Sequence, residues 1–170
     1  MYNETRGLVN ITVGGQQGMN IDPIELNDEV VALLISEELP VSDLRSSNQP
    51  KLFGVRVGGS IIGIVGIESH GYVGLLRSLV VGKASRKAGC GQKLVAKAEA
   101  WASEKGVKTL YLLTTTAARY FSRLGYEVVP RNQAPASIAN TAQFTELCPT
   151  SATFMCKTLT ANKALNRTNR

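Results

Sequence analysis

One stretch of the chain decides its fold: Leu79-Val80-Val81-Gly82-Lys83-Ala84-Ser85-Arg86-Lys87-Ala88-Gly89-Cys90-Gly91-Gln92. It begins in an apolar run and leads into a basic amphipathic segment that ends near Lys105. This order predicts a buried strand, a glycine-containing turn and a long helix from about Gln92 to Lys105. Within the turn stands the pattern Arg-x-x-Gly-x-Gly.

The composition of this turn is that of an anion site. Glycines let the backbone approach an anion closely, and the first N–H groups of a helix have no partner within the helix. Arg86 and Lys87 add positive charge at the same place. A turn that merely starts a helix is the alternative, and the strand before it and the basic helix after it favour the anion site. The chain lacks Gly-x-x-x-x-Gly-Lys-Ser/Thr, and a dinucleotide fingerprint would require glycine at Leu94.

The elements around this turn predict a mixed α/β (α+β) sheet, with antiparallel strands first and strand–helix–strand units after them. Before the turn we expect a helix from Asn27 or Asp28 to about Glu38 and strands over Leu52–Val57, Ser60–Ser69 and Tyr72–Val81. After it we expect strands over Thr109–Thr114, from Glu127 to Val129 and over Thr153–Leu159, a short helix over Ala117–Leu124 and a helical turn around Ala136–Asn140.

Length and composition indicate one globular domain, since the chain has 170 residues, 44% of them hydrophobic. We divide it into a flexible lead-in (1–18) in which Leu8–Val13 can form a strand, a domain (19–160) and a basic tail (161–170). The longest apolar run falls far short of the ~20 residues that cross a bilayer. Three cysteines without Cys-x-x-Cys favour incidental thiols over disulfides or metal ligands. We therefore expect a cytoplasmic protein with no secretion signal, metal or membrane partner.

Positive charge is concentrated in the middle of the chain. Lys83–Lys108 holds seven Lys or Arg against two Glu, within a net charge of +6. Such a segment suits an anionic partner, either nucleic acid or a polyphosphate cofactor, and a solvated helix face is the neutral alternative. A nucleic acid leaves the glycine turn unexplained, so no nucleic-acid partner is expected.

The Arg86-x-x-Gly89-x-Gly91 turn resembles the acetyl-coenzyme A pyrophosphate loop of the Gcn5-related N-acetyltransferase (GNAT) superfamily, and the resemblance covers about residues 20 to 160. Leu75–Val81, Tyr111–Ala117 and Leu147-Cys148-Pro149 are similar to the arsenic-resistance, arsinothricin N-acetyltransferase-like group. Similarity to the acetyltransferase domain of N-acetylglutamate synthases is also present. The resemblance implies the GNAT acyl-CoA N-acyltransferase fold with a splayed central strand pair, and acetyl-CoA as cosubstrate. A homodimer stays open.

The resemblance also implies roles for individual residues. The pantetheine arm would pair with the strand end, where the N–H of Val81 would stabilise the tetrahedral oxyanion. Backbone N–H groups from Lys87 to Gln92 would hold the pyrophosphate. The implied cofactor-binding residues are Leu79, Val80, Val81, Arg86, Lys87, Ala88, Gly89, Cys90, Gly91, Gln92, Thr114, Ala117 and Phe121.

Two positions depart from the family pattern. Thr114 stands where a pantetheine-binding Asn is usual, and Phe121 stands where the Tyr that protonates the thiolate is usual. Tyr120 is adjacent but lies about 100° further round a helix, so it is not expected to substitute. The proton donor to the thiolate therefore stays open: it can be a water, Tyr111 or Tyr126. It can also be absent, because model thiols titrate near ~8.5 and a thiolate leaves readily.

The acceptor side is predicted from the central strands. Glu68 is the expected catalytic base, with His70 or a water chain as alternatives. Arg77, within an apolar strand, forms either a structural ion pair, with Glu68 as the candidate partner, or a clamp on an acceptor anion. Strand alternation places Ser78 on the opposite side from Arg77. Arg131 and Thr141, with Ser151 nearby, either complete an anionic acceptor pocket together with Arg77 and Ser78 or belong to a solvated loop.

These residues predict an acetyl-CoA-dependent N-acetyltransferase that acts on a small amino-acid-like amine by direct attack in a ternary complex. The narrower resemblance implies an arsenical such as arsinothricin as the acceptor. Another acidic amino acid or a protein N-terminus is the alternative acceptor. A non-catalytic acyl-CoA or ligand-binding protein of the same fold is the alternative of a different class.

Overall fold

The computed structural model describes residues 19–160, and within them the chain forms a seven-stranded mixed sheet in the order β1-β2-β3-β4-β5-β7-β6. The strands are β1 (Ile21–Ile24), β2 (Lys51–Val57), β3 (Ser60–His70), β4 (Val73–Val81), β5 (Thr109–Thr114), β6 (Glu127–Val128) and β7 (Thr153–Thr158). The predicted lead-in, its Leu8–Val13 strand and the basic tail lie outside the described residues. The mixed α/β sheet predicted from the sequence is confirmed.

Helices and helical turns connect these strands. They are α1 (Asp28–Ser36), the 3-10 helix η1 (Lys83–Ala88), α2 (Cys90–Glu104), α3 (Ala118–Arg123), the 3-10 turn η2 (Arg131–Gln133), α4 (Ala136–Ala139) and the π-helical turn η3 (Gln143–Leu147). The sequence did not predict β1, η1, η2 or η3, because each is short and has too few positions for a periodic pattern. Between residues 19 and 160, no helix combines the length and the apolar character needed to span a membrane.

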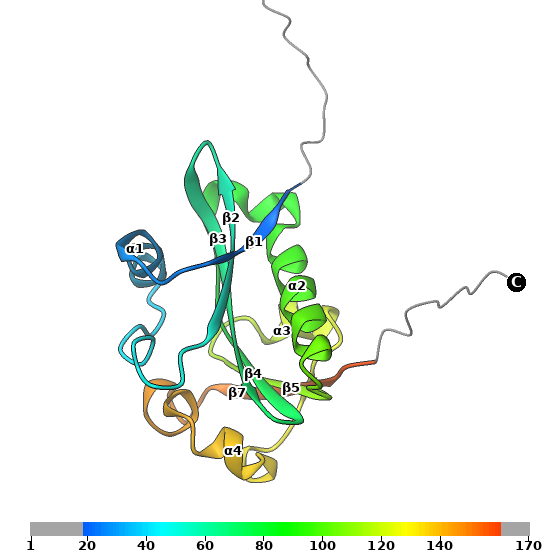
Figure 1. Cartoon of the computed structure of the whole chain (residues 1–170). Helices are drawn as coiled ribbons and strands as arrows, with labels where there is room; N and C mark the ends of the chain where they lie inside the picture. The colour runs from blue at the N-terminus through cyan, green and yellow to red at the C-terminus, as the bar shows by residue number, and fades with distance from the viewer. Residues whose placement is uncertain (1–18, 161–170) are drawn as a thin grey trace, which may run out of the picture.

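The helices cover the sheet on both faces, with α1 and α2 on opposite sides (Figure 1). The apolar stripe of α2, which includes Leu94 and Ala98, packs with Phe53 and Leu76 in the largest core cluster. On the other face, Val30 and Leu34 of α1 pack with Leu52, Ile64 and Val80. The side chain of Asn27 starts α1 by accepting a hydrogen bond of 3.0 Å from the N–H of Val30.

The sheet opens between β4 and β5, which form its parallel pair. These strands pair only where Val73–Leu75 faces Thr109–Tyr111, so β4 has no strand partner on that side from Leu76 onward. On its other side β4 stays paired with β3, but the register shifts at Ser78, whose φ is +55°. This bulge bends β4 away from β5. The splayed strand pair expected from the sequence is therefore present.

Candidate functional site

Two connected cavities occupy the gap between β4 and β5. The inner cavity, of about 260 Å³, is bounded by Leu76–Leu79 of β4, Leu112–Ala117, the Glu38–Pro40 segment and the Leu147–Pro149 segment. The outer cleft, of about 520 Å³, lies where β4 leads into η1 and α2. Both share the following lining residues: Leu39, Leu79, Thr116, Ala117 and Tyr120. The cavities therefore form one groove that passes Tyr120.

The glycine turn leaves the beginning of α2 open to the outer cleft. Gly89 has φ +70°, a left-handed conformation that ends η1 and precedes α2, and no side chain caps the helix there. The N–H of Lys93 donates to the carbonyl of Gly89 at 3.2 Å. The amides of the three preceding residues, Cys90–Gln92, thus have no partner within the helix. Their N–H groups can donate hydrogen bonds to an anion, and Gly89 and Gly91 line the cleft beside them.

Arg86 crosses the outer cleft. Its Nε donates to the carbonyl of Val81 at 3.0 Å, and its Nη2 donates to Glu37 at 2.5 Å. Glu37 follows the last turn of α1, so the ion pair ties the glycine turn to the opposite helix. The sequence did not indicate Glu37, which lies 49 positions from its partner.

The other predicted cofactor residues fall into two groups. Leu79, Val80, Val81, Gln92 and Ala117 line the outer cleft. The side chain of Cys90 is fully buried in the core, where burial raises the pKa of its thiol, so Cys90 can offer only its backbone to the groove. Ala88 is exposed and does not line either cavity, and the side chain of Lys87 is outside the described structure.

Thr114 and Phe121 line the inner cavity. The hydroxyl of Thr114 accepts a hydrogen bond of 2.9 Å from the N–H of Ala117, which holds the start of α3 against the end of β5. Phe121 packs its ring against Tyr120 and Tyr126 within the main core. Both departures from the family pattern therefore have structural contacts of their own.

Tyr120, rather than Tyr111 or Tyr126, reaches the groove. It lines both cavities, and burial raises the pKa of its phenol. Tyr111 stacks on Phe154 in a separate cluster. Tyr126 is buried and donates to Glu99 at 3.0 Å. The sequence did not predict Tyr120 at the groove, but α3 is short and both Tyr120 and Phe121 line the inner cavity.

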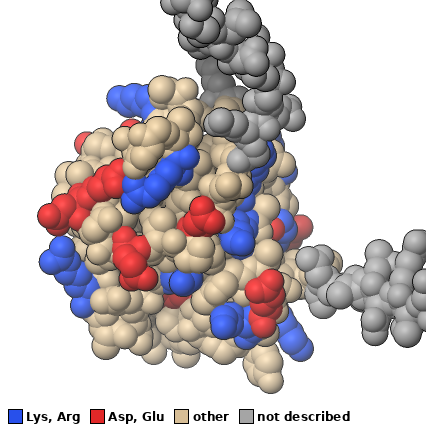
Figure 2. Space-filling model, turned by 45° about the horizontal axis from the view of Figure 1, so that its top comes forward, with Lys and Arg blue, Asp and Glu red and all other residues tan. Residues whose placement is uncertain are grey.

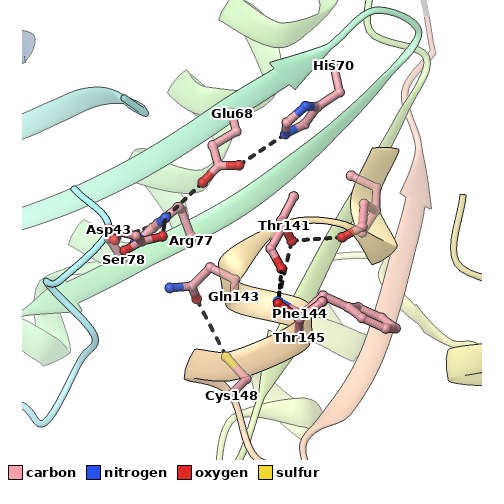
Figure 3. Close-up of polar contacts among 11 residues, drawn as sticks. Asp43, Glu68, His70, Arg77, Ser78, Thr141, Gln143, Phe144, Thr145 and Cys148 are labelled. Carbon is pink, nitrogen blue, oxygen red and sulfur yellow. Dashed lines mark hydrogen bonds and ion pairs between the residues drawn. The ribbon is translucent and has the colours of Figure 1, made fainter. Parts of the chain in front are cut away.

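A buried ion cluster, drawn in Figure 3, adjoins the inner cavity, because Arg77 lines that cavity. Both Nη atoms of Arg77 donate to Asp43, with 2.6 Å between Nη2 and Oδ1, and Nη1 donates to Glu68 at 2.8 Å. The other carboxylate oxygen of Glu68 lies 3.0 Å from Nε2 of His70. Burial alone would lower the pKa of Arg77, but its two carboxylate partners outweigh burial and raise it. The ion pair between Arg77 and Glu68 that the sequence left open is present.

The bulge in β4 changes the predicted direction of Ser78. Ser78 lines the inner cavity beside Arg77, and Nε of Arg77 donates to its hydroxyl at 3.3 Å. The prediction that these two side chains would face opposite sides is wrong, because alternation fails where a strand contains an extra residue. Glu68 does not line either cavity, so its predicted role as base requires a bridging water.

The late loop contributes different residues from those predicted. Thr141 donates to the carbonyl of Ile138 at 2.7 Å, and Arg131 donates to the carbonyl of Phe144 at 2.9 Å while lying 4.3 Å above its ring. Neither residue lines a cavity. Gln143 and Cys148 of this loop do, and Ser151 is exposed and does not. The π-helical turn that presents Gln143 has no simple sequence signal.

The surface carries charges of both signs. Figure 2 shows acidic and basic side chains interspersed on one face, with no continuous basic surface there. Between residues 19 and 160, no cluster of three or more His, Cys, Asp or Glu side chains could hold a metal ion.

The groove and the splayed sheet define a class of protein, and comparison with known proteins identifies it. The model of the Acetyltransferase (GNAT) family matches residues 22–126, which is more than half of the chain. The chain therefore belongs to the acetyltransferase (GNAT) family.

One curated relative is an uncharacterized N-acetyltransferase of Chlorobaculum tepidum, 36% identical over 81 residues. The match covers 47% of this chain and 52% of the relative, so the chain spans about half the length of the relative it matches.

Two solved structures share the fold. N-acetylglutamate synthase of Neisseria gonorrhoeae, complexed with coenzyme A and N-acetyl-glutamate, has a TM-score of 0.71 at 15% identity, over 84% of this chain and 35% of that one. The ribosomal-protein-S18-alanine N-acetyltransferase of Escherichia coli has a TM-score of 0.60 at 20% identity, over 86% and 97%. At these identities the likeness shows the fold alone.

Proposed function

We propose that this protein is an acetyl-CoA-dependent N-acetyltransferase that transfers acetyl to a small primary amine. The observation that carries the proposal is the groove, in which an unpaired strand edge, from Leu76 to Val81, runs into the uncapped amides of α2. Family membership and the name of the curated relative support the same activity.

Each part of the groove suits one part of the cosubstrate. The amides of Cys90–Gln92 can bind the pyrophosphate, and the open edge of β4 can pair with the pantetheine amides as an added strand does. This arrangement directs the thioester along β4 toward the inner cavity, and the N–H of Val81, in the outer cleft, can stabilise the oxyanion. The amine enters from the inner cavity, so that both reactants meet in one ternary complex.

Direct transfer requires two proton movements. The amine nitrogen forms its bond to the carbonyl carbon and loses a proton, and the C–S bond breaks to release the thiolate. We propose that Glu68 receives the first proton through a water, because Glu68 lies behind Arg77. Tyr120 is the best placed donor to the thiolate, because it lines both the inner cavity and the outer cleft.

The arsenical acceptor implied by the narrower resemblance remains a prediction. It requires Arg77 or Arg131 to bind an acidic group. Arg77 already has two carboxylate partners, whereas Arg131 donates to the carbonyl of Phe144 through Nη2 and its buried Nη1 has no partner among the described residues. Cytoplasmic localisation is likewise proposed, supported by the free thiols of Cys90, Cys148 and Cys156. Gel filtration tests whether the chain is a homodimer.

A non-catalytic acyl-CoA-binding protein is the second candidate. It is favoured by the buried Phe121, which stands where the family has its usual acid. Such a protein would bind acetyl-CoA but release no thiol with any amine.

The decisive test measures acetyl-CoA binding by calorimetry and thiol release with a panel of amines. Gly89→Ala places a residue with a side chain at a position whose backbone is left-handed (φ +70°), and it should weaken acetyl-CoA binding by about tenfold or more. Gly71→Ala is the matched control, because it has the same strain (φ +74°) and equally open surroundings in the turn between β3 and β4. Equal loss of binding in both variants, or no binding by the wild type, would contradict the proposal.

A further inference from the structure

We propose that Asp43 is a specificity-determining residue: it occupies the guanidinium of Arg77 and so restricts the acceptor to amines that carry no carboxylate. This inference rests on the proposed acetyltransferase function and adds the chemical class of the acceptor. It concerns the inner cavity, where Arg77 is the one cationic lining residue among the described residues.

Four of the five N–H groups of the Arg77 guanidinium already have partners among the described residues. Asp43 binds the guanidinium in a bidentate manner, Glu68 accepts a hydrogen bond from Nη1, and Nε donates to the hydroxyl of Ser78. The Arg77 side chain is 2% exposed, and those of Asp43 and Glu68 are 12% and 9% exposed. Asp43 thus occupies the edge formed by Nη1 and Nη2, and little of the buried guanidinium is left to bind an acceptor carboxylate.

Displacing Asp43 would be unfavourable. An incoming carboxylate would have to separate Asp43 from its partner and leave a second negative charge near Glu68, in a site from which water is largely excluded. Breaking a buried ion pair and placing like charges together both oppose such binding. A carboxylate acceptor is therefore rejected by groups that belong to the protein itself.

The other residues that line the inner cavity also disfavour a negatively charged acceptor. Glu38, beside the rim segment Leu39-Pro40, adds a carboxylate, and the remaining lining residues carry no formal charge. Arg131 lies outside the lining, held by the ring and carbonyl of Phe144. The wall thus favours a neutral or cationic amine with an apolar body.

The connection that carries Asp43 also provides one wall of the inner cavity. Asp43 belongs to the turn that follows Glu38–Pro40, between α1 and β2. A purely structural ion pair predicts that its loss lowers stability for all acceptors alike. A specificity role predicts instead that its loss changes the ratio between acceptors.

The test compares acceptors that differ only by a carboxylate: leucine against 3-methylbutylamine, and lysine against cadaverine, with leucinamide as a neutral isostere. The wild type should show a kcat/KM about tenfold or more higher for the member without the carboxylate. Asp43→Asn should reduce this ratio by about tenfold, through a gain on the carboxylate member. Glu29→Gln, which perturbs the exposed pair with Arg56, should leave the ratio unchanged.

Further readouts keep the result unambiguous. Acetyl-CoA affinity and circular dichroism establish whether Asp43→Asn is folded. If it does not fold, the inference is tested by the kcat/KM ratios of the wild type for each acceptor pair and by the same ratios in Asp43→Ser. Wild-type preference for leucine, glutamate or arsinothricin overturns the inference while leaving the acetyltransferase intact. An equal loss on both members of each pair in Asp43→Asn also overturns it. Acetyl-CoA binding without thiol release on any amine overturns the proposed function, and the inference with it.

Discussion

The contact between Gly91 and Tyr120 offers the sharpest test of the groove geometry. A Cβ placed on Gly91 would lie 2.6 Å from the hydroxyl of Tyr120, and 3.5 Å from the ring carbon that carries it. The first distance is a clash and the second is an ordinary contact. The effect of Gly91→Ala on stability should therefore depend on one atom of a neighbouring helix, the hydroxyl oxygen of Tyr120.

The magnitudes follow from two opposing effects. In the wild type the hydroxyl must retreat by roughly 1 Å, and overpacking of this kind costs about 1–3 kcal/mol, with the lower end expected because Tyr120 is only half-buried. In Tyr120→Phe the clash is absent, so replacing a helical glycine by alanine should be neutral or stabilise by up to about 1 kcal/mol. We expect a coupling free energy of about 1–2 kcal/mol between the two substitutions.

Urea unfolding of the four proteins measures this coupling, with circular dichroism as the signal. The expected result is that Gly91→Ala lowers the free energy of unfolding of the wild type but not of Tyr120→Phe. If Gly91→Ala has the same effect in both, within about 0.5 kcal/mol, Tyr120 does not approach the start of α2 as described. The role proposed for its hydroxyl at the groove would then lose its geometric basis.

Two other contacts give predictions of different kinds. Arg86→Ala should change the free energy of unfolding by less than about 1 kcal/mol, because the Arg86 side chain is 49% exposed, yet weaken acetyl-CoA binding by about tenfold in calorimetry. Arg56→Ala, an exposed control, should leave binding unchanged. Burial, and then the neighbouring Glu99, raise the pKa of Tyr126 above its ordinary value. Its neutral phenol thus contributes stability that is complete below about pH 10 and is lost above it. Tyr126→Phe should therefore reduce the fall in unfolding free energy between about pH 10 and 11 by about 1 kcal/mol, and an unchanged slope would contradict this.

The glycine turn could be predicted from the sequence because its determinants are local. Gly89, Gly91 and Arg86 lie within six consecutive positions, and both the helix start and the anion site depend on backbone conformation at those positions. The same holds for the amphipathic α2. In each case neighbouring residues decide the structure, and the rest of the chain only has to accommodate it.

The acceptor side could not be predicted in the same way, because its contacts join distant parts of the chain. Asp43 lies 34 positions from Arg77, in a turn whose course no periodic pattern specifies. The sequence indicated that a buried arginine needs a partner, and it named Glu68, but it had no means of choosing Asp43 among the eight acidic residues that precede Leu52. Long-range ion pairs of this kind require the fold.

The bulge at Ser78 explains why the groove and the ion cluster occur together. In a regular strand Leu76 and Leu79 would face opposite sides, yet both pack in the core cluster under α2, and Val80 packs under α1. One extra residue in β4 produces this reset of alternation, and it lets β4 leave β5 while remaining paired with β3. Opposite the bulge, Gly66 has no side chain, and a Cβ there would lie only 3.3 Å from Cγ of Arg77. The same irregularity thus opens the edge proposed to bind the cosubstrate and makes the space in which Arg77 reaches its carboxylates.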